Sequence, residues 1–194
     1  MNLQKLFNMQ KQLDDHIMDE HPELKGQDNL DWKILALQVE LGECANEWRG
    51  FKKWSNDQEP RGQGTYLEYG CKCEGVGNRW VKKNPLLEEY VDCLHFILSI
   101  GNDLGYNDIT EEWVSEQGDY SEETTTDTFI LLLEHAADVY TYEKAYRQYM
   151  YETLFLAFIA LGLDERHLGF TWQQIEKAYL DKNEVNHKRQ NTGY

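Results

Sequence analysis

Two stretches of the chain each carry apolar residues at helical spacing with acidic residues directly beside them. In the first stretch, residues 34–51, apolar residues recur at alternating steps of three and four, which is typical of a helix with one buried face. These residues are Ile34, Leu37, Leu41, Cys44, Trp48 and Phe51. At roughly 100° per residue, Glu40, Glu43 and Glu47 all lie about 60–120° to one side of that face. The spacing predicts a helix to about Trp54 with carboxylates along the edge of the core.

The second stretch, residues 86–104, repeats this arrangement. Its apolar stripe consists of Leu86, Tyr90, Cys93, Ile97, Ile100 and Leu104. Glu89 and Asp92 lie at the same offset of about 60–120°, whereas Glu88 points roughly opposite the stripe. Glu89 is therefore the expected partner of Asp92. The other flank of this helix is also apolar, so the helix is expected to be central and mostly buried.

These paired acidic residues suggest a bound cation. Carboxylates at the rim of a buried helix are costly unless a positive charge neutralises them. Oxygen ligands suit a hard cation, with Mg²⁺ as the first choice and Mn²⁺ as the second. The alternative is a solvated helix face, which is the commoner explanation of a single acidic pair. Two matched pairs favour the metal site, whereas Glu134 and Asp138 have no partner pair nearby and are predicted to lie on the surface.

The charge of the chain limits its ligands. Its 194 residues suffice for one domain with a sizeable core. They include 35 acidic and 19 basic residues, and the net charge of −16 repels the backbone of duplex nucleic acid. A small phosphorylated ligand that enters together with metal ions remains compatible with this charge.

Cysteine usage and hydropathy bear on the cellular setting. Cys44 and Cys93 lie on predicted core stripes, and Cys71 and Cys73 have no second cysteine pair at zinc spacing. The N-terminus begins as a polar amphipathic helix and not as a signal peptide. The longest apolar run, residues 154–163, is about half of what a bilayer requires. We expect a reduced, cytoplasmic protein that does not bind membranes.

The rest of the chain predicts further helices, and hence an all-α helical bundle. A helix is expected over residues 3–20, and two helices or one bent helix over 127–162. Thr171 predicts the cap of a last helix over 172–188. Residues 105–124 between them are polar and turn-rich.

Residues 57–84 are expected to be an insertion within the single domain. Five glycines punctuate this segment, and residues 65–69 and 79–81 have the composition of two strands that pair as a small hairpin. A surface loop is the alternative. Pro85 follows at the favoured first position of the second acidic helix.

The C-terminal helix carries a cluster of potential ligand-binding residues. The spacing of Lys182, Asn186 and Arg189 places them within about 60° of one another on one helix face. Lysine and arginine donate to anionic oxygens, and asparagine offers both a donor and an acceptor. The pattern suits a nucleotide, although a solvated helix end whose cations complement the helix dipole is the alternative.

Together, these motifs resemble those of a known superfamily. The metal-binding signature of the all-α NTP pyrophosphatases is similar to two acidic motifs of this chain, Glu40-x-x-Glu43 and Glu89-x-x-Asp92-x-x-His95-Phe96. The C-terminal segment 179–194 resembles the closing motif of the dimeric dUTPases, one branch of that superfamily. Segments 9–14, 36–43 and 51–55 also resemble that branch.

The chain departs from the pattern of this branch in two places. The 45 residues between Glu43 and Glu89 exceed the compact spacing usual for the superfamily, and the surplus is the segment 57–84. The segment 105–150 also matches weakly.

The resemblance implies an all-helical homodimer that hydrolyses dUTP, and also dUDP, to dUMP. Two or three Mg²⁺ ions, or Mn²⁺ in their place, would be held by Glu40, Glu43, Glu89 and Asp92. Either Glu40 or Glu43 would act as the general base. Phosphate oxygens would be bound by Lys182 and Arg189, with Tyr194 closing over them.

For the base and sugar, the resemblance indicates Gln10, Trp54, His95, Phe96 and Asn186. Asn186 would read the uracil edge, with Trp54 and Phe96 packed against the ring or the deoxyribose. Each has an alternative. Trp54 and Phe96 suit simple packing, and His95 lies about 180° from the apolar stripe, which suits a surface position.

Two other functions stay open at this point. A relative with another base preference, such as a dCTP or general NTP pyrophosphatase, would share the metal site. A protein-interaction role would instead use the segment 57–84 and the acidic surface to bind a regulatory partner.

Overall fold

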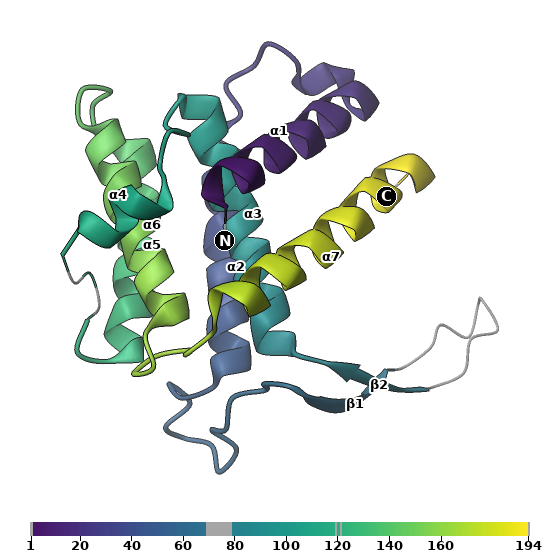
Figure 1. Cartoon of the computed structure of the whole chain (residues 1–194), viewed down its shortest axis with the longest axis vertical. Coiled ribbons are helices and arrows are strands. Elements are labelled where there is room, and N and C mark those ends of the chain that lie inside the picture. Colours follow the sequence, from purple (N-terminus) through teal and green to yellow (C-terminus); the bar gives the residue numbers. More distant parts are fainter. Residues whose placement is uncertain (1, 69–78, 119, 121, 194) are drawn as a thin grey trace.

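The computed structural model describes residues 2–68, 79–118, 120 and 122–193, and over these residues the fold is all-α, as predicted. The elements, drawn in Figure 1, are α1 (Leu3–Glu20), a 3₁₀ turn η1 (Pro22–Leu24), α2 (Leu30–Trp48), β1 (Gly64–Glu68), β2 (Arg79–Lys83), α3 (Pro85–Leu104), α4 (Glu111–Glu116), α5 (Thr125–Thr141), α6 (Arg147–Leu163) and α7 (Trp172–Thr192).

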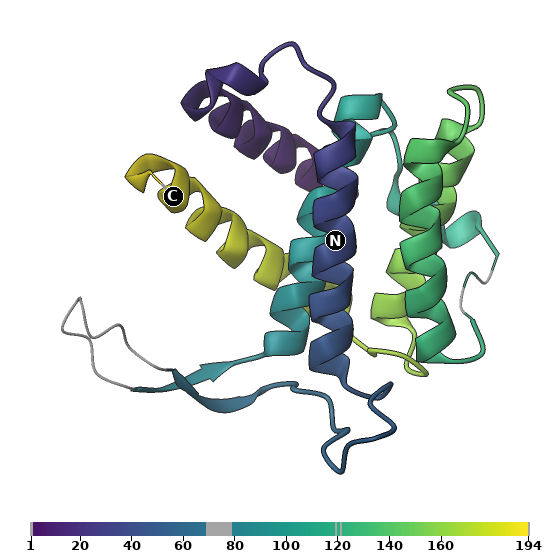
Figure 2. The ribbon, with the colours of Figure 1, turned by 180° about the vertical axis from the view of Figure 1, so that it is seen from behind.

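Helices α2 and α3 form the centre of the molecule. Helices α1 and α7 pack on one side of this pair and α5 and α6 on the other, as both views show (Figures 1 and 2). As predicted, α3 is buried on both flanks. On α3, the Tyr90 ring stacks on Phe158 with 4.3 Å between ring centroids. This contact requires glycine at 162, because a Cβ there would lie 2.2 Å from the Tyr90 hydroxyl oxygen.

Local capping signals correctly predicted several helix ends. Asn84 accepts a hydrogen bond from the Leu87 amide at the start of α3, where Pro85 occupies the first turn. Thr171 and Gln174 form a reciprocal capping box at the start of α7. Helix α1 begins and ends where its apolar spacing predicts.

The prediction that the first acidic helix continues to Trp54 is wrong. Helix α2 ends at Trp48 because Arg49 adopts a left-handed conformation with φ of 67°. The Arg49 guanidinium donates to the Asp57 carbonyl oxygen at 2.9 Å and 3.1 Å, which fixes this turn. Phe51 therefore lies beyond the helix, although its spacing continues the apolar stripe.

The segments that the sequence left irregular or undecided are now defined. Residues 127–162 belong to two helices, α5 and α6, and not to one bent helix. The polar segment 105–124 contains the short helix α4, which was not predicted; Thr110 caps it by accepting a hydrogen bond from the Trp113 amide. Glu134 is exposed, as predicted, while Asp138 is half-buried.

The two predicted strands pair. Strands β1 and β2 are antiparallel, with Gly64 opposite Lys83 and Glu68 opposite Arg79. Cys71 and Cys73 lie outside the described residues. Within the described part of the chain, no helix has both the length and the apolarity to cross a bilayer.

Candidate active site

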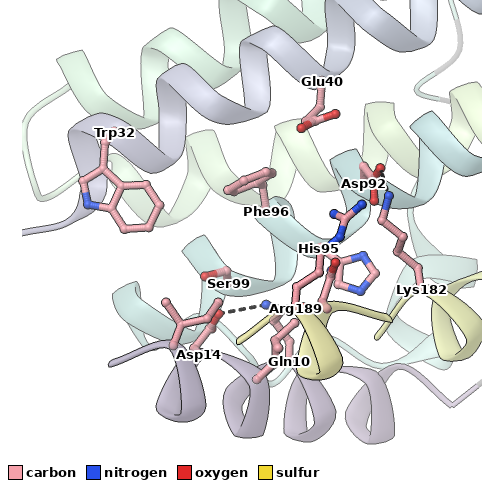
Figure 3. A pocket seen from close by; sticks show the side chains of 13 residues that line it. Gln10, Asp14, Trp32, Glu40, Asp92, His95, Phe96, Ser99, Lys182 and Arg189 are labelled. Carbon is pink, nitrogen blue, oxygen red and sulfur yellow. Dashed lines mark hydrogen bonds and ion pairs between the residues drawn. The ribbon is translucent and has the colours of Figure 1, made fainter. Parts of the chain in front are cut away.

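A cavity of about 330 Å³ opens between α1, α2, α3 and α7 (Figure 3). Its lining comes from all four helices: Gln10, Leu13, Asp14 and Ile17; Trp32 and Glu40; Asp92, His95, Phe96 and Ser99; Lys182, Asn186 and Arg189. Six of the predicted site residues therefore contribute to one cavity besides the carboxylates Glu40 and Asp92. They are Gln10, His95, Phe96, Lys182, Asn186 and Arg189.

One end of the site is acidic. One carboxylate oxygen each from Glu40, Glu89 and Asp92 lies within 4.8 Å of the others, although the residues come from two helices. We call these three residues the carboxylate cluster; all of them are half-buried. Figure 3 shows Glu40 of α2 and Asp92 of α3 close to each other at this end of the cavity. Glu43 is exposed and stands outside this cluster, although its charge acts on all three members.

The carboxylate cluster is short of positive charge. Burial raises the pKa of Glu40 and of Glu89 to about 7, and the negative charges of Asp92 and Glu43 add to the effect. Burial also raises the pKa of Asp92, against the lowering effect of Lys182. Closely spaced oxygen donors whose charges are not balanced fit a hard divalent cation such as Mg²⁺.

Helix α7 brings cations to this acidic end. The Lys182 ammonium forms an ion pair with an Asp92 carboxylate oxygen. Arg189 is near enough for its charge to lower the pKa of Asp92 as well. Asn186 lies between them on the same face of α7, as the spacing predicted. The cationic face of α7 therefore lies directly opposite the carboxylate cluster.

The other end of the cavity is a network of hydrogen bonds that the sequence did not single out. The Gln10 amide nitrogen donates to Asp14 Oδ1 at 2.8 Å (Figure 3). The Tyr179 hydroxyl donates to Gln10 Oε1 at 2.9 Å. Asp14 Oδ2 is buried and has no hydrogen-bond partner among the described residues. Burial raises the pKa of Asp14 to about 6, although the charge of Lys33 opposes the shift.

One feature of the sequence predicts that Asp14 belongs to the same site as Gln10, although Asp14 was not among the predicted site residues. It lies four residues after Gln10 in segment 9–14, and residues four apart share a helix face. The sequence pattern indicates a role for Trp32 less strongly, because this residue precedes the apolar stripe of α2. Its indole nitrogen donates to Asn29 Oδ1 at 3.0 Å, which holds the ring at the cavity wall.

His95 lines the cavity, and the surface position that was its alternative is wrong. His95 is 6% exposed, and its ring stacks on Tyr179 of α7 at 4.2 Å between ring centroids. Its Nδ1 lies 2.8 Å from the Val91 carbonyl oxygen, so Nδ1 carries the proton. Burial lowers the pKa of His95 to about 4, so the ring is neutral. The surface alternative fails because α7 covers α3 on the side opposite its apolar stripe.

The remaining predicted substrate residues are placed as follows. Phe96 is half-buried and lines the cavity, as Figure 3 shows. Trp54 is 78% exposed, does not line the cavity and meets Phe51 edge-on at 5.8 Å between ring centroids. Tyr194 lies outside the described residues.

The fold and the site together define a class of protein. A helical bundle that holds a carboxylate cluster opposite a cationic helix face is suited to metal-assisted hydrolysis of a phosphorylated ligand. A family model described as dUTPase matches residues 2–70 and 78–194. The chain belongs to this family, the all-α dUTPases of the dimeric type, and is an enzyme of the dUTP-hydrolysing kind.

The extent of this match bears on the two departures noted in the sequence. The match passes through the segment 105–150 and omits only residues 71–77 of the segment 57–84. No curated protein sequence matches the chain.

Proposed function

We propose that this protein hydrolyses dUTP to dUMP and pyrophosphate, and dUDP to dUMP and phosphate, with Mg²⁺ as its cofactor. The observation that carries the proposal is the polarity of the cavity. The carboxylate cluster and the cations of α7 lie at one end, and the hydrogen-bonding groups of Gln10 and Asp14 lie at the other. A nucleotide has the same polarity, with an anionic tail joined to a base.

The metal site would consist of Glu40, Glu89 and Asp92, joined by Glu43 from the next turn of α2. About two or three Mg²⁺ ions, or Mn²⁺, held by these residues would neutralise charge on the phosphate oxygens and lower the pKa of a bound water. Glu40 lines the cavity and Glu43 does not. For that reason we assign the general base to Glu40, which would take the proton of the attacking water.

The cations of α7 would bind the phosphate tail. Lys182 and Arg189 both line the cavity beside the carboxylate cluster. Charge-assisted hydrogen bonds from these groups to phosphate oxygens are roughly twice as strong as neutral ones. Their position on one helix face orients the tail toward Glu40 and away from the Gln10 end of the cavity.

At the far end, the available hydrogen bonds suit a uracil edge. Uracil presents one N–H donor between two carbonyl acceptors. The unpartnered oxygen of Asp14 offers an acceptor, and the amides of Gln10 and Asn186 offer donors. Cytosine has an acceptor in place of that N–H donor, so Asp14 would have no hydrogen-bond donor to accept from. Phe96 and Trp32 provide the apolar walls.

We further propose that the protein is a homodimer. Leu35 and Val39 on α2 and Ile130 on α5 are 51–62% exposed. Because α2 packs against α5, we infer that these side chains form one apolar face across the two helices. The Gln38 amide donates to the Leu133 carbonyl oxygen at 3.1 Å, which ties the helices together under this face. Trp32, one turn before Leu35, lines the cavity, so a second copy seated here would lie beside the active site.

The dimer is tested by light scattering after size-exclusion chromatography. The wild-type chain is expected at twice the monomer mass, and Leu35→Glu at the monomer mass. Tyr142→Glu, at an exposed site on the α5–α6 connection, is the control and should remain dimeric. A monomeric wild-type chain would contradict the proposed dimer.

Pyrophosphate release tests the activity itself. We expect release from dUTP with Mg²⁺ and none with EDTA. Assays with dCTP, dTTP, dATP and dGTP under the same conditions test the base preference. A higher kcat/KM for dCTP, or equal values for all five nucleotides, would favour the alternative pyrophosphatase functions. No hydrolysis of any nucleotide would leave the protein-interaction role.

A further inference from the structure

A second cavity, of about 820 Å³, lies between strand β2, the first turns of α3 and the middle of α7. In Figure 1, β1 and β2 leave the N-terminal end of α3 and run below α7. We call this cavity the cationic groove. Its basic lining residues are Arg79, Lys82, Lys83, Lys177 and Lys182, and its acidic ones are Glu88 and Asp181.

The charge of the cationic groove is opposite to that of the chain. Five of its lining residues are lysine or arginine and two are acidic, whereas the whole chain has 19 basic and 35 acidic residues. Lys177 is paired with Asp181 in an ion pair along α7. Lys82 and Lys83 make no ion pair or side-chain hydrogen bond within the part of the chain that the structure describes. Their charges are therefore available to a ligand.

The cationic groove is continuous with the candidate active site. Lys182 lines both cavities. On α3, Val91 faces the groove while the next residue, Asp92, faces the active site. An anion that leaves the carboxylate cluster past Lys182 therefore meets the lysines of β2.

We propose that the cationic groove binds the pyrophosphate released from dUTP and thereby acts as a product site next to the catalytic centre. This inference rests on the proposed function, because the reaction supplies the anion. A water that gives one proton to the general base would add to one of the two phosphorus atoms flanking the α,β-bridging oxygen. The bond from that phosphorus to the bridging oxygen would break, so that dUMP and pyrophosphate separate. Lysine ammonium groups are compact point charges that suit such an anion without demanding one fixed geometry.

The acidic surface around the groove limits the size of the ligand. A long polyanion such as single-stranded nucleic acid would meet the acidic surface beyond the groove, where a net charge of −16 repels it. A compact anion stays among the lysines. Pyrophosphate also spans more of them than orthophosphate does, so it should bind more tightly.

The test is calorimetric titration of sodium pyrophosphate into the full chain in EDTA. Without a divalent cation, the carboxylate cluster repels the anion, so binding reports on the groove. We expect the wild-type chain to bind pyrophosphate, and orthophosphate more weakly. The double variant Lys82→Glu/Lys83→Glu should bind pyrophosphate at least about tenfold more weakly. The milder Lys82→Gln/Lys83→Gln should be intermediate.

A matched control separates the groove from overall charge. Lys25→Glu/Lys144→Glu changes the net charge by the same amount at two exposed positions on other connections. This control should bind pyrophosphate as the wild-type chain does. Equal weakening in both double variants, equal affinity for phosphate and pyrophosphate, or no binding by the wild-type chain would overturn the proposal. Because no turnover is involved, binding that is lost only in the groove variants supports the site even if dUTP is not hydrolysed.

Discussion

The Lys182 ammonium on α7 contacts the Asp92 carboxylate on α3, and 90 residues of chain separate the two. This ion pair joins the carboxylate cluster to the cationic helix face, and it lowers the pKa of Asp92 against the effect of burial. Glu40 and Glu89 form no such ion pair with any residue that the structure describes, and burial keeps their pKa values raised to about 7. The site thus contains one neutralised carboxylate and two whose charge is unbalanced.

Replacing Asp92 tests the metal assignment. Asp92→Ala removes one of the three clustered carboxylates and leaves Lys182 without its partner, while the helices keep their packing. We expect kcat/KM for dUTP to fall by about a hundredfold or more, with an unchanged circular dichroism spectrum. Turnover close to that of the wild-type chain at saturating Mg²⁺ would refute the assignment. Glu116→Ala, at an exposed position on α4 that lines neither cavity, is the control.

The raised pKa values predict how stability depends on pH. Between the ordinary value of 4.5 and about 7, folded Glu40 holds a proton that the unfolded chain releases. Stability therefore falls as pH rises through this window when no divalent cation is present. Buried His95, whose pKa is about 4, acts in the opposite direction, because its unfolded form binds protons below about 6.5. The contribution of Glu40 to the pH dependence of stability is therefore measured by comparing the wild-type chain with a variant that lacks this carboxylate.

Glu40→Gln provides this comparison. In EDTA, the wild-type melting temperature should fall relative to that of Glu40→Gln as pH rises from about 5 to 8. Added Mg²⁺ should raise the wild-type melting temperature more at pH 8 than at pH 5, since the metal binds ionised carboxylates. Parallel melting curves of the two proteins across this range would contradict the shifted pKa.

Helix boundaries could be predicted from the sequence where the residues that set them lie within one helical turn. Pro85 and the cap Thr171 act within one helical turn, so they predicted where α3 and α7 begin. The end of α2 depended on a contact between Arg49 and Asp57 beyond the helix, and it was predicted six residues too late. Apolar spacing alone does not reveal such a contact.

The same distinction applies to the site. Glu40, Glu43, Glu89 and Asp92 were predicted to converge because two helices carry them at the same angular offset. All but Glu43 lie in the carboxylate cluster. The surface alternative for His95 was wrong because the burial of this residue comes from α7, 84 residues further on at Tyr179. Asp14 was missed because an isolated aspartate on an amphipathic helix is ordinarily solvated. Its burial follows from the packing of α1 against α3 and α7.

Asn186 is predicted to contribute to base selection. Asn186→Ala removes a side chain that lines the cavity and can both donate and accept. The ratio of kcat/KM for dUTP to that for dCTP should fall by about tenfold, because loss of one well-placed hydrogen bond weakens discrimination by that order. The exposed Asn191→Ala on the same helix should keep the wild-type ratio. An unchanged ratio in Asn186→Ala would remove this residue from base reading.

Two glycines within helices test the packing of the core. Gly162→Ala would place a Cβ 2.2 Å from the Tyr90 hydroxyl oxygen, so we expect a loss of about 1–3 kcal/mol in the free energy of unfolding. Gly42→Ala meets no atom within 4 Å and should be neutral or stabilising by up to about 1 kcal/mol. Urea denaturation measures both. Equal effects would mean that Tyr90 does not pack against α6 as described.

Two tryptophans separate what the resemblance implies from what the structure shows. The resemblance placed Trp54 at the substrate, but Trp54 is 78% exposed and lies outside the cavity, while Trp32 forms part of its wall. A side chain that packs against the bound base or sugar lowers KM through buried apolar area. We expect Trp32→Ala to raise KM for dUTP by about tenfold, and Trp54→Ala to leave it within about twofold. Initial rates at saturating Mg²⁺ measure both. A large rise in KM for Trp54→Ala would show that the turn at residues 49–57 closes over the nucleotide when it binds.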